Sequence, residues 1–121
     1  MTTHLVYGDV HAHPNHDNTR ADLVSKLIID LKPDVVVNIG DGADLPSLSS
    51  YDKGLRHFQG RNYKEDISAH LDFEERVWEP VKRQKKKLPR RVYTAGNHDY
   101  RIERALYKSP ELSCAISMND L

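Results

Sequence analysis

Three short apolar runs divide the chain, and each is followed by a glycine and then a polar side chain. The runs are residues 4–7 before Gly8-Asp9, residues 35–39 before Gly40-Asp41, and residues 91–94 shortly before Gly96-Asn97. Apolar runs of this length are typical of strands buried in a parallel sheet. We therefore expect three buried strands, each ending where a polar motif begins.

Between the first two runs, apolar residues recur at helical spacing. They are Leu23, Val24, Leu27, Ile28 and Leu31. This pattern predicts an amphipathic helix over residues 19–32. Pro33 ends it, because the residue before a proline avoids the helical region. Strand, helix and strand then form a βαβ unit with two parallel strands.

The second half of the chain shows one long helical pattern after an irregular stretch. Residues 44–61 have no period and are predicted to form a loop. Asn62 is expected to cap the helix that follows, with Glu65 bonding back to it in a capping box. The apolar side of this helix is predicted to carry Ile67, Leu71, Val77, Trp78 and Val81. Pro80 should kink or break the helix, and a further helix is expected over residues 100–107.

Charge is balanced overall, with 18 basic and 18 acidic residues, but it is unevenly distributed. Seven basic residues and no acid lie in residues 82–91, a pattern that can contact nucleic-acid phosphates. Six acids lie in residues 65–79, so acids precede bases along the predicted helix and complement its dipole. No aromatic residue interrupts the basic run to stack on bases. We favour a solvated helix end, with nucleic-acid contact as the alternative.

Cysteine content and hydropathy indicate a compartment. The single cysteine, Cys114, cannot form an internal disulfide and fits a reducing environment. No apolar run approaches the roughly 20 residues of a membrane helix, and the first residues do not resemble a signal peptide. We expect a cytoplasmic protein without a membrane partner.

The polar motifs after the three strands should meet at one edge of the sheet. In open parallel sheets, active sites form beyond the carboxyl ends of the strands. In the first motif, Asp9 and His11 are two residues apart on an extended segment, so their side chains point the same way. A carboxylate and an imidazole together suit Mn, Fe or Zn. The alternative is a turn capped by Asp9, with His11 incidental.

The second and third motifs add further candidate ligands. Asp41 leaves its strand where Asp9 leaves the first, so its carboxylate could bridge two ions about 3.5–4 Å apart. The Asn97 side-chain oxygen can bind metal and leave His98 free to act as an acid. Each motif alone would be read as an ordinary turn. Three in this arrangement, each after an apolar run, are poorly explained by turns.

These motifs, GDVHAH, GDGAD and GNHD, resemble the opening signatures of the calcineurin-like metallophosphoesterase superfamily over residues 4–104. The resemblance implies an α/β sandwich, mostly of parallel strands, with the metal site at the strand ends and a phosphoester substrate. It implies two divalent metal ions, Mn first with Fe or Zn as alternatives. It assigns metal binding to Asp9, His11, Asp41 and Asn97, and catalysis to His98 with Asp44 beside it.

Departures from the family pattern narrow the subgroup. The related protein phosphatases carry an arginine after the second aspartate of GDGAD, where this chain has Leu45. The chain looks more like phage- and bacterium-encoded members often labelled nuclease-like, which would act in the host cytoplasm if phage-encoded. His13 has no settled role in the pattern; it could contact substrate phosphate or be a solvated loop residue.

The most consequential departure is that no histidine follows His98. The family pattern continues with an isolated histidine and a GHxH element that complete both metal shells. We therefore expect residues 1–121 to be a single partial domain, the N-terminal half of the sandwich. A C-terminal polypeptide or a homo-oligomer would complete it, and Leu112, Ile116 and Met118 would have little to pack against alone.

Two other readings stay open. One is a degenerate, non-catalytic domain that serves as a binding or assembly subunit. The other is a generic nucleotide-binding domain, which the absence of G-x-G-x-x-G and of a P-loop weakens.

Overall fold

The computed structural model describes residues 1–121 and contains a three-stranded, all-parallel sheet in the order β1-β2-β3. The strands are β1 (His4–Tyr7), β2 (Val35–Asn38) and β3 (Arg90–Tyr93). The register pairs Val6 with Val37 and Val37 with Val92. All three predicted strands and the α/β class are confirmed.

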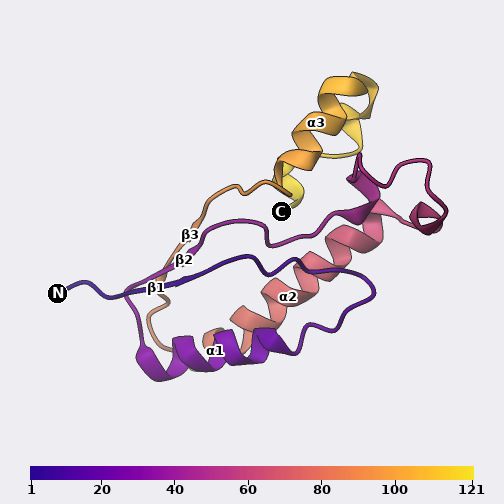
Figure 1. Cartoon of the computed structure of the whole chain (residues 1–121). Coiled ribbons are helices and arrows are strands. Elements are labelled where there is room, and N and C mark those ends of the chain that lie inside the picture. Colours follow the sequence, from indigo (N-terminus) through magenta and orange to yellow (C-terminus); the bar gives the residue numbers. More distant parts are fainter.

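Three α-helices accompany the sheet: α1 (Arg20–Leu31), α2 (Tyr63–Arg83) and α3 (Tyr100–Lys108). Figure 1 shows α1 and α2 lying along the sheet, while α3 and the last residues lie beyond the ends of the strands. None of these helices combines the length and the apolar character that a membrane span requires. The predicted βαβ unit is present as β1-α1-β2.

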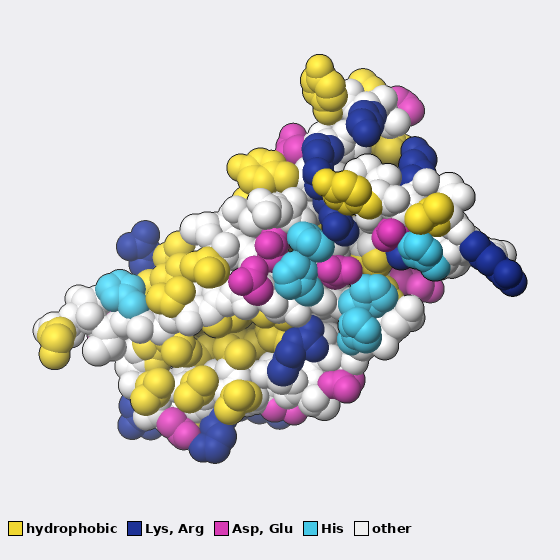
Figure 2. Space-filling model, in the orientation of Figure 1, with side chains coloured by type: hydrophobic (Ala, Val, Ile, Leu, Met, Phe, Trp, Pro, Cys, Tyr) yellow, Lys and Arg dark blue, Asp and Glu magenta, His cyan; other side chains and the backbone are white.

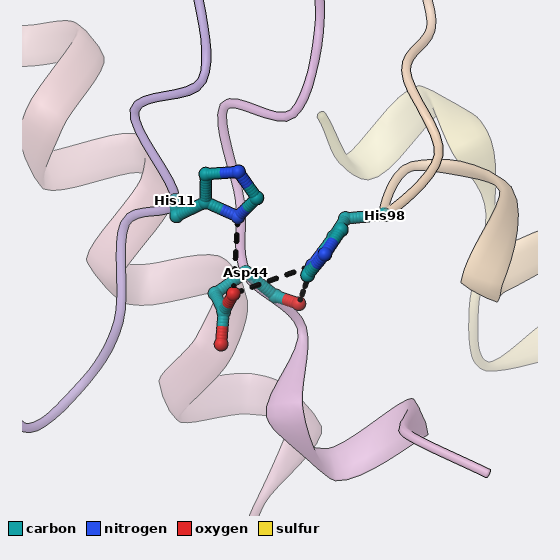
Figure 3. A group of neighbouring side chains, drawn as sticks. All are labelled: His11, Asp44 and His98. Atoms are coloured by element: carbon teal, nitrogen blue, oxygen red, sulfur yellow. Dashed lines mark hydrogen bonds and ion pairs between the residues drawn. The ribbon is translucent and has the colours of Figure 1, made fainter. Parts of the chain in front are cut away.

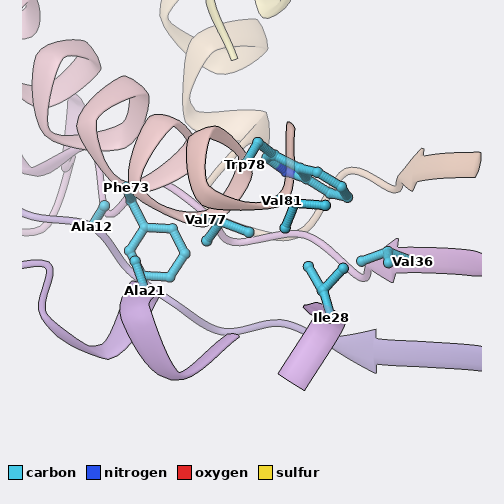
Figure 4. Packing of buried hydrophobic residues seen from close by; sticks show 8 residues of the cluster. All are labelled: Ala12, Ala21, Ile28, Val36, Phe73, Val77, Trp78 and Val81. Atoms are coloured by element: carbon cyan, nitrogen blue, oxygen red, sulfur yellow. The ribbon is translucent and has the colours of Figure 1, made fainter. Parts of the chain in front are cut away.

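The main core lies where α1 and α2 meet one face of the sheet (Figure 4). Its buried members are Ala12, Ala21, Ile28, Val36, Phe73, Val77, Trp78 and Val81. Leu5 and Tyr7 of β1 pack against them, so alternate strand residues point into this core. Burial of these side chains attaches both helices to the sheet.

The other face of the sheet is largely uncovered, so the strands are buried on one side only. Val6 is 56% exposed and Ile39 is 51% exposed. On α1, Leu23, Leu27 and Leu31 are also exposed. Figure 2 shows yellow side chains gathered over this side of the molecule. Both helices lie on the opposite face, so nothing in this chain covers Val6 and Ile39.

The buried stripe of α2 differs from the predicted one. It contains Asp66, His70, Phe73, Val77, Trp78 and Val81. Leu71, expected inside, is 51% exposed. The first two turns bury polar rather than apolar groups: Asp66 accepts hydrogen bonds from the Ser47 amide and hydroxyl. Burial raises the pKa of the Asp66 carboxyl. A pattern of apolar residues at helical spacing cannot reveal buried helix positions that are polar.

Both ends of α2 also differ in detail from expectation. The Asn62 side chain caps the helix, but it accepts from the Lys64 amide at 2.9 Å and no capping box with Glu65 forms. The helix continues through Pro80 to Arg83, so the predicted break is wrong. Pro80 lies in the last turn, where its missing N–H removes only one bond from the helix.

A second, smaller core surrounds α3. Ala43, Leu45, Ile102 and Ile116 are buried there, and Met118 packs against them. Ile116 and Met118 therefore have packing partners, contrary to expectation, whereas Leu112 is 38% exposed. This core fixes α3 beside the loop that carries Asp44.

Candidate metal centre

The polar motifs are held in register because the ladder of β1 and β2 continues past the strand ends. The Asp9 amide donates to the Gly40 carbonyl at 3.2 Å, and the His11 amide donates to the Asp41 carbonyl at 2.9 Å. The parallel pairing thus places the first two motifs side by side. The predicted convergence of these motifs at one sheet edge is what the structure shows.

Three of the candidate ligands adopt a left-handed backbone, so the prediction that Asp9 and His11 lie on an extended segment is wrong. The φ angles are 53° at Asp9, 50° at His11 and 55° at Asp41. Such a conformation costs an ordinary residue about 1–2 kcal/mol. Strain of this kind gathers at functional sites, where the position of a side chain matters more than backbone energy.

The third motif approaches the second so closely that only glycine fits. Gly40 has φ 102°, and a Cβ there would overlap the Gly96 backbone. A Cβ on Gly96 would overlap the Asp41 carboxylate. The His98 amide donates to Asp41 Oδ1 at 2.7 Å, which ties the two motifs together.

Asp9, His11 and Asp41 form the group best suited to a metal ion. Their ligand atoms all lie within 4.8 Å of one another. His11 Nε2 is 3.9 Å from Asp9 Oδ1, and the Asp9 side chain is 76% exposed. Two carboxylates and one imidazole fit Mn, Fe or Zn and leave coordination positions open.

Asp44 joins His11 to His98 (Figure 3). Asp44 Oδ1 lies 3.1 Å from His11 Nδ1 and 3.3 Å from His98 Nδ1, and the Asp44 carbonyl oxygen lies 2.8 Å from His98 Nδ1. A carbonyl or an ionised carboxylate only accepts, so both Nδ1 atoms carry protons. Each Nε2 is left for a metal ion or a substrate, and Asp44 orients both rings.

The remaining predicted residues fall in two places. Asn97 is exposed in the turn between Gly96 and His98, both of which adjoin Asp41. His13 is directed elsewhere: its ring packs on that of His16 at 4.7 Å, and its Nδ1 accepts from the Asn15 amide. Asn97 thus lies in a turn whose flanking residues adjoin Asp41, whereas His13 has other neighbours.

Asp99 is a component of the site that the sequence did not reveal. It is fully buried, and its Oδ2 accepts from the Asp41 amide at 3.1 Å, the Gly96 amide at 2.8 Å and the Tyr93 hydroxyl at 3.1 Å. Burial, with the Asp99 charge, raises the pKa of Tyr93, which keeps its hydroxyl protonated as a donor. Asp99 thereby fixes the main chain that carries Asp41. In the sequence, only the position of Asp99 within the GNHD motif indicates that this residue is important.

We expect Asp99→Ala to lower the free energy of unfolding by about 3 kcal/mol, because it leaves buried donors without an acceptor. Asp99→Asn keeps one acceptor oxygen and should cost less. Glu103→Ala, at an exposed position of α3, is the control and should change stability by less than about 0.5 kcal/mol. Urea unfolding measures all three; equal stability of Asp99→Ala and the control would contradict this role.

Comparison with known protein families assigns the chain to one of them. A family model described as calcineurin-like phosphoesterase matches residues 3–117. No curated protein matches the chain. The match spans all three polar motifs and both cores.

Proposed function

Because the chain belongs to the calcineurin-like phosphoesterase family, we propose that its polar site hydrolyses a phosphate ester with two divalent metal ions. The observation that carries this proposal is the convergence of Asp9, His11 and Asp41, whose ligand atoms lie within 4.8 Å of one another beside His98. Acidic groups alone are common on surfaces. Here the strained backbone and the glycine-only contacts support a site built for binding.

Each side chain has a role in this proposal. Asp9 and His11 would hold the first ion, Asp41 would contact both ions, and Asn97 would hold the second. Divalent ions, when bound, polarise phosphoryl oxygens and activate water for attack on phosphorus. His98, with Nδ1–H held by the Asp44 carbonyl, would present Nε2 to the leaving oxygen and, in its imidazolium form, donate the Nε2 proton there.

The finer assignments rest on chemistry and on the sequence motifs. Mn is our first choice of metal, with Fe or Zn as alternatives, because the ligands mix carboxylate and imidazole. A phosphodiester, as for nuclease-like members, is the preferred substrate. The single cysteine supports a cytoplasmic site of action, the host cytoplasm if the gene is phage-encoded.

We predict that Asp41→Ala and Asn97→Ala weaken Mn²⁺ binding by about tenfold or more, and that His98→Ala changes it little. The reason is that Asp41 and Asn97 would be ligands, whereas His98 would act on the substrate. Loss of a group that merely orients a ligand already costs about 10–100-fold in metal affinity. Calorimetric titration of Mn²⁺ tests this prediction.

Asp30→Ala is the matched control for this titration, because Asp30 is an exposed acid of α1 that pairs with Lys26. Equal loss of affinity in the Asp41, Asn97 and His98 variants would place His98 among the ligands and refute the assigned roles. A wild-type chain that binds no divalent ion would refute the proposal as a whole.

A partner chain is the second part of the proposal. Within this chain the second ion would have only Asp41 and Asn97 as protein ligands, and no histidine follows His98. Exposed apolar side chains occur on the uncovered face of the sheet (Val6 and Ile39) and on α1 (Leu23, Leu27 and Leu31), and they offer surface for association. β1 is also an edge strand. A polypeptide that supplies histidines, or a second copy of the chain, could bind there.

A non-catalytic binding subunit is the competing function. The small number of ligands for the second ion favours it. The two functions differ in one measurement: a binding subunit would take up metal or phosphate ester without turnover under any condition of complementation.

A further inference from the structure

Arg101 is a cationic side chain that hydrogen bonds directly to the loop that carries Asp44. Its Nη1 donates to the Asp44 carbonyl at 2.9 Å and to the Leu45 carbonyl at 3.3 Å. The same Asp44 oxygen lies 2.8 Å from His98 Nδ1. Arg101 and His98 therefore meet at one atom, which places the guanidinium beside the group that would face the substrate.

Arg101 is one of the arginines of this chain that form no ion pair. Arg61, Arg76 and Arg91 pair with carboxylates at 2.8–3.0 Å. Arg101 forms no ion pair, and only its Nη1 has protein acceptors. An arginine has five N–H donors in a rigid fork, so the donors on Nε and Nη2 remain free on a partly exposed side chain.

We propose that Arg101 is a phosphate-binding residue of this site, donating from Nε and Nη2 to the two non-bridging oxygens of the ester. This inference rests on the proposed function and adds a substrate contact to it. Guanidinium groups bind phosphate oxygens through two parallel hydrogen bonds. The Nη1 contacts hold the side chain in one place, which reduces the entropy lost when phosphate binds.

A purely structural role is the alternative for Arg101. Leu45 has a left-handed backbone with φ 53°, and the Arg101 side chain satisfies the carbonyls on either side of that bend. A structural clamp would affect the position of Asp44, and hence metal binding and stability. A phosphate ligand would affect phosphate binding first.

The experiment compares the full chain with Arg101→Gln, Arg101→Lys and Arg104→Gln. Arg104 lies one turn further along α3 and is exposed. Arg104→Gln is the control, because it removes the same charge as Arg101→Gln. Inorganic phosphate is titrated without metal and with diamagnetic Zn²⁺ while the arginine Nε–Hε signals are followed by NMR. Mn²⁺ affinity and melting temperature are measured in parallel.

We expect phosphate to shift the Nε–Hε signal of Arg101, with or without metal, and to leave that of Arg104 in place. Arg101→Gln should weaken phosphate binding about tenfold, the usual loss for one charge-assisted contact, with Mn²⁺ affinity within about twofold of wild type. Arg101→Lys should recover part of the loss. Arg104→Gln should bind phosphate like the wild type.

Three results would overturn the inference: an Arg101 signal that phosphate does not move, unchanged phosphate binding in Arg101→Gln, or parallel losses of Mn²⁺ affinity and melting temperature. Absence of metal uptake by the wild type would instead contradict the proposed function. The metal-free titration would still decide the role of Arg101 in that case.

Discussion

Turnover of a nitrophenyl phosphodiester by His98→Ala is expected to fall by about 10²–10⁴-fold while its metal content stays near that of the wild type. Removal of a positioned acid or base typically costs this much in rate. In the structure, the Asp44 carbonyl fixes His98 Nδ1 as the protonated nitrogen, so Nε2 is free to face the leaving oxygen. The assay uses the preparation that shows metal-dependent turnover, either the chain alone or the chain with its complement.

His4→Ala is the control for this measurement, because His4 is an exposed histidine at the start of β1. Unchanged turnover in His98→Ala would mean that the leaving group needs no help from this residue. A parallel loss of metal would show that His98 is a ligand.

The second large effect concerns completeness of the site. We expect the 121-residue chain alone to hydrolyse a phosphodiester at least about 100-fold more slowly than the same chain with a polypeptide that supplies the missing histidines. An ion with few protein ligands is held loosely, and a displacement of about 1 Å can cost 100-fold in rate. A Mn²⁺-dependent assay, with light scattering to follow association, measures both quantities.

Two substitutions at similarly exposed leucines, one a test and the other its control, examine association. Leu31→Gln alters one of the exposed apolar side chains of α1, whereas Leu71→Gln alters an exposed leucine of α2. We expect only the first to weaken association and rescue. A monomer of the wild-type chain with full metal-dependent turnover would refute the need for a partner.

The parts of the fold that depend on neighbours in sequence could be predicted. The apolar runs identified β1, β2 and β3 to within one residue, and Asn62 was recognised as a helix cap. The order of the motifs, each after a strand, was enough to predict that Asp9, Asp41 and His98 would meet. These predictions needed only the parallel geometry of βαβ units.

The parts that depend on approach between distant segments could not be predicted. The role of Asp99 depends on a hydrogen bond that it accepts from the amide of Asp41, 58 residues away in the sequence. Asp44 contacts both His11 and His98 because its loop lies between the loops that carry these two histidines. The polar stripe of α2 was missed because Asp66 is buried against Ser47 rather than against apolar side chains. Each contact is set by tertiary packing.

The left-handed backbone at Asp9, His11 and Asp41 affects which substitutions are favourable at these positions. Glycine adopts that conformation freely, so replacing any of the three by glycine would relieve strain and would be favoured once their side chains were no longer needed. Mutation would then erase the site quickly, since here stability and binding oppose each other. Under the proposed function, loss of the metal site would therefore remove the reason for a residue other than glycine at each of these three positions.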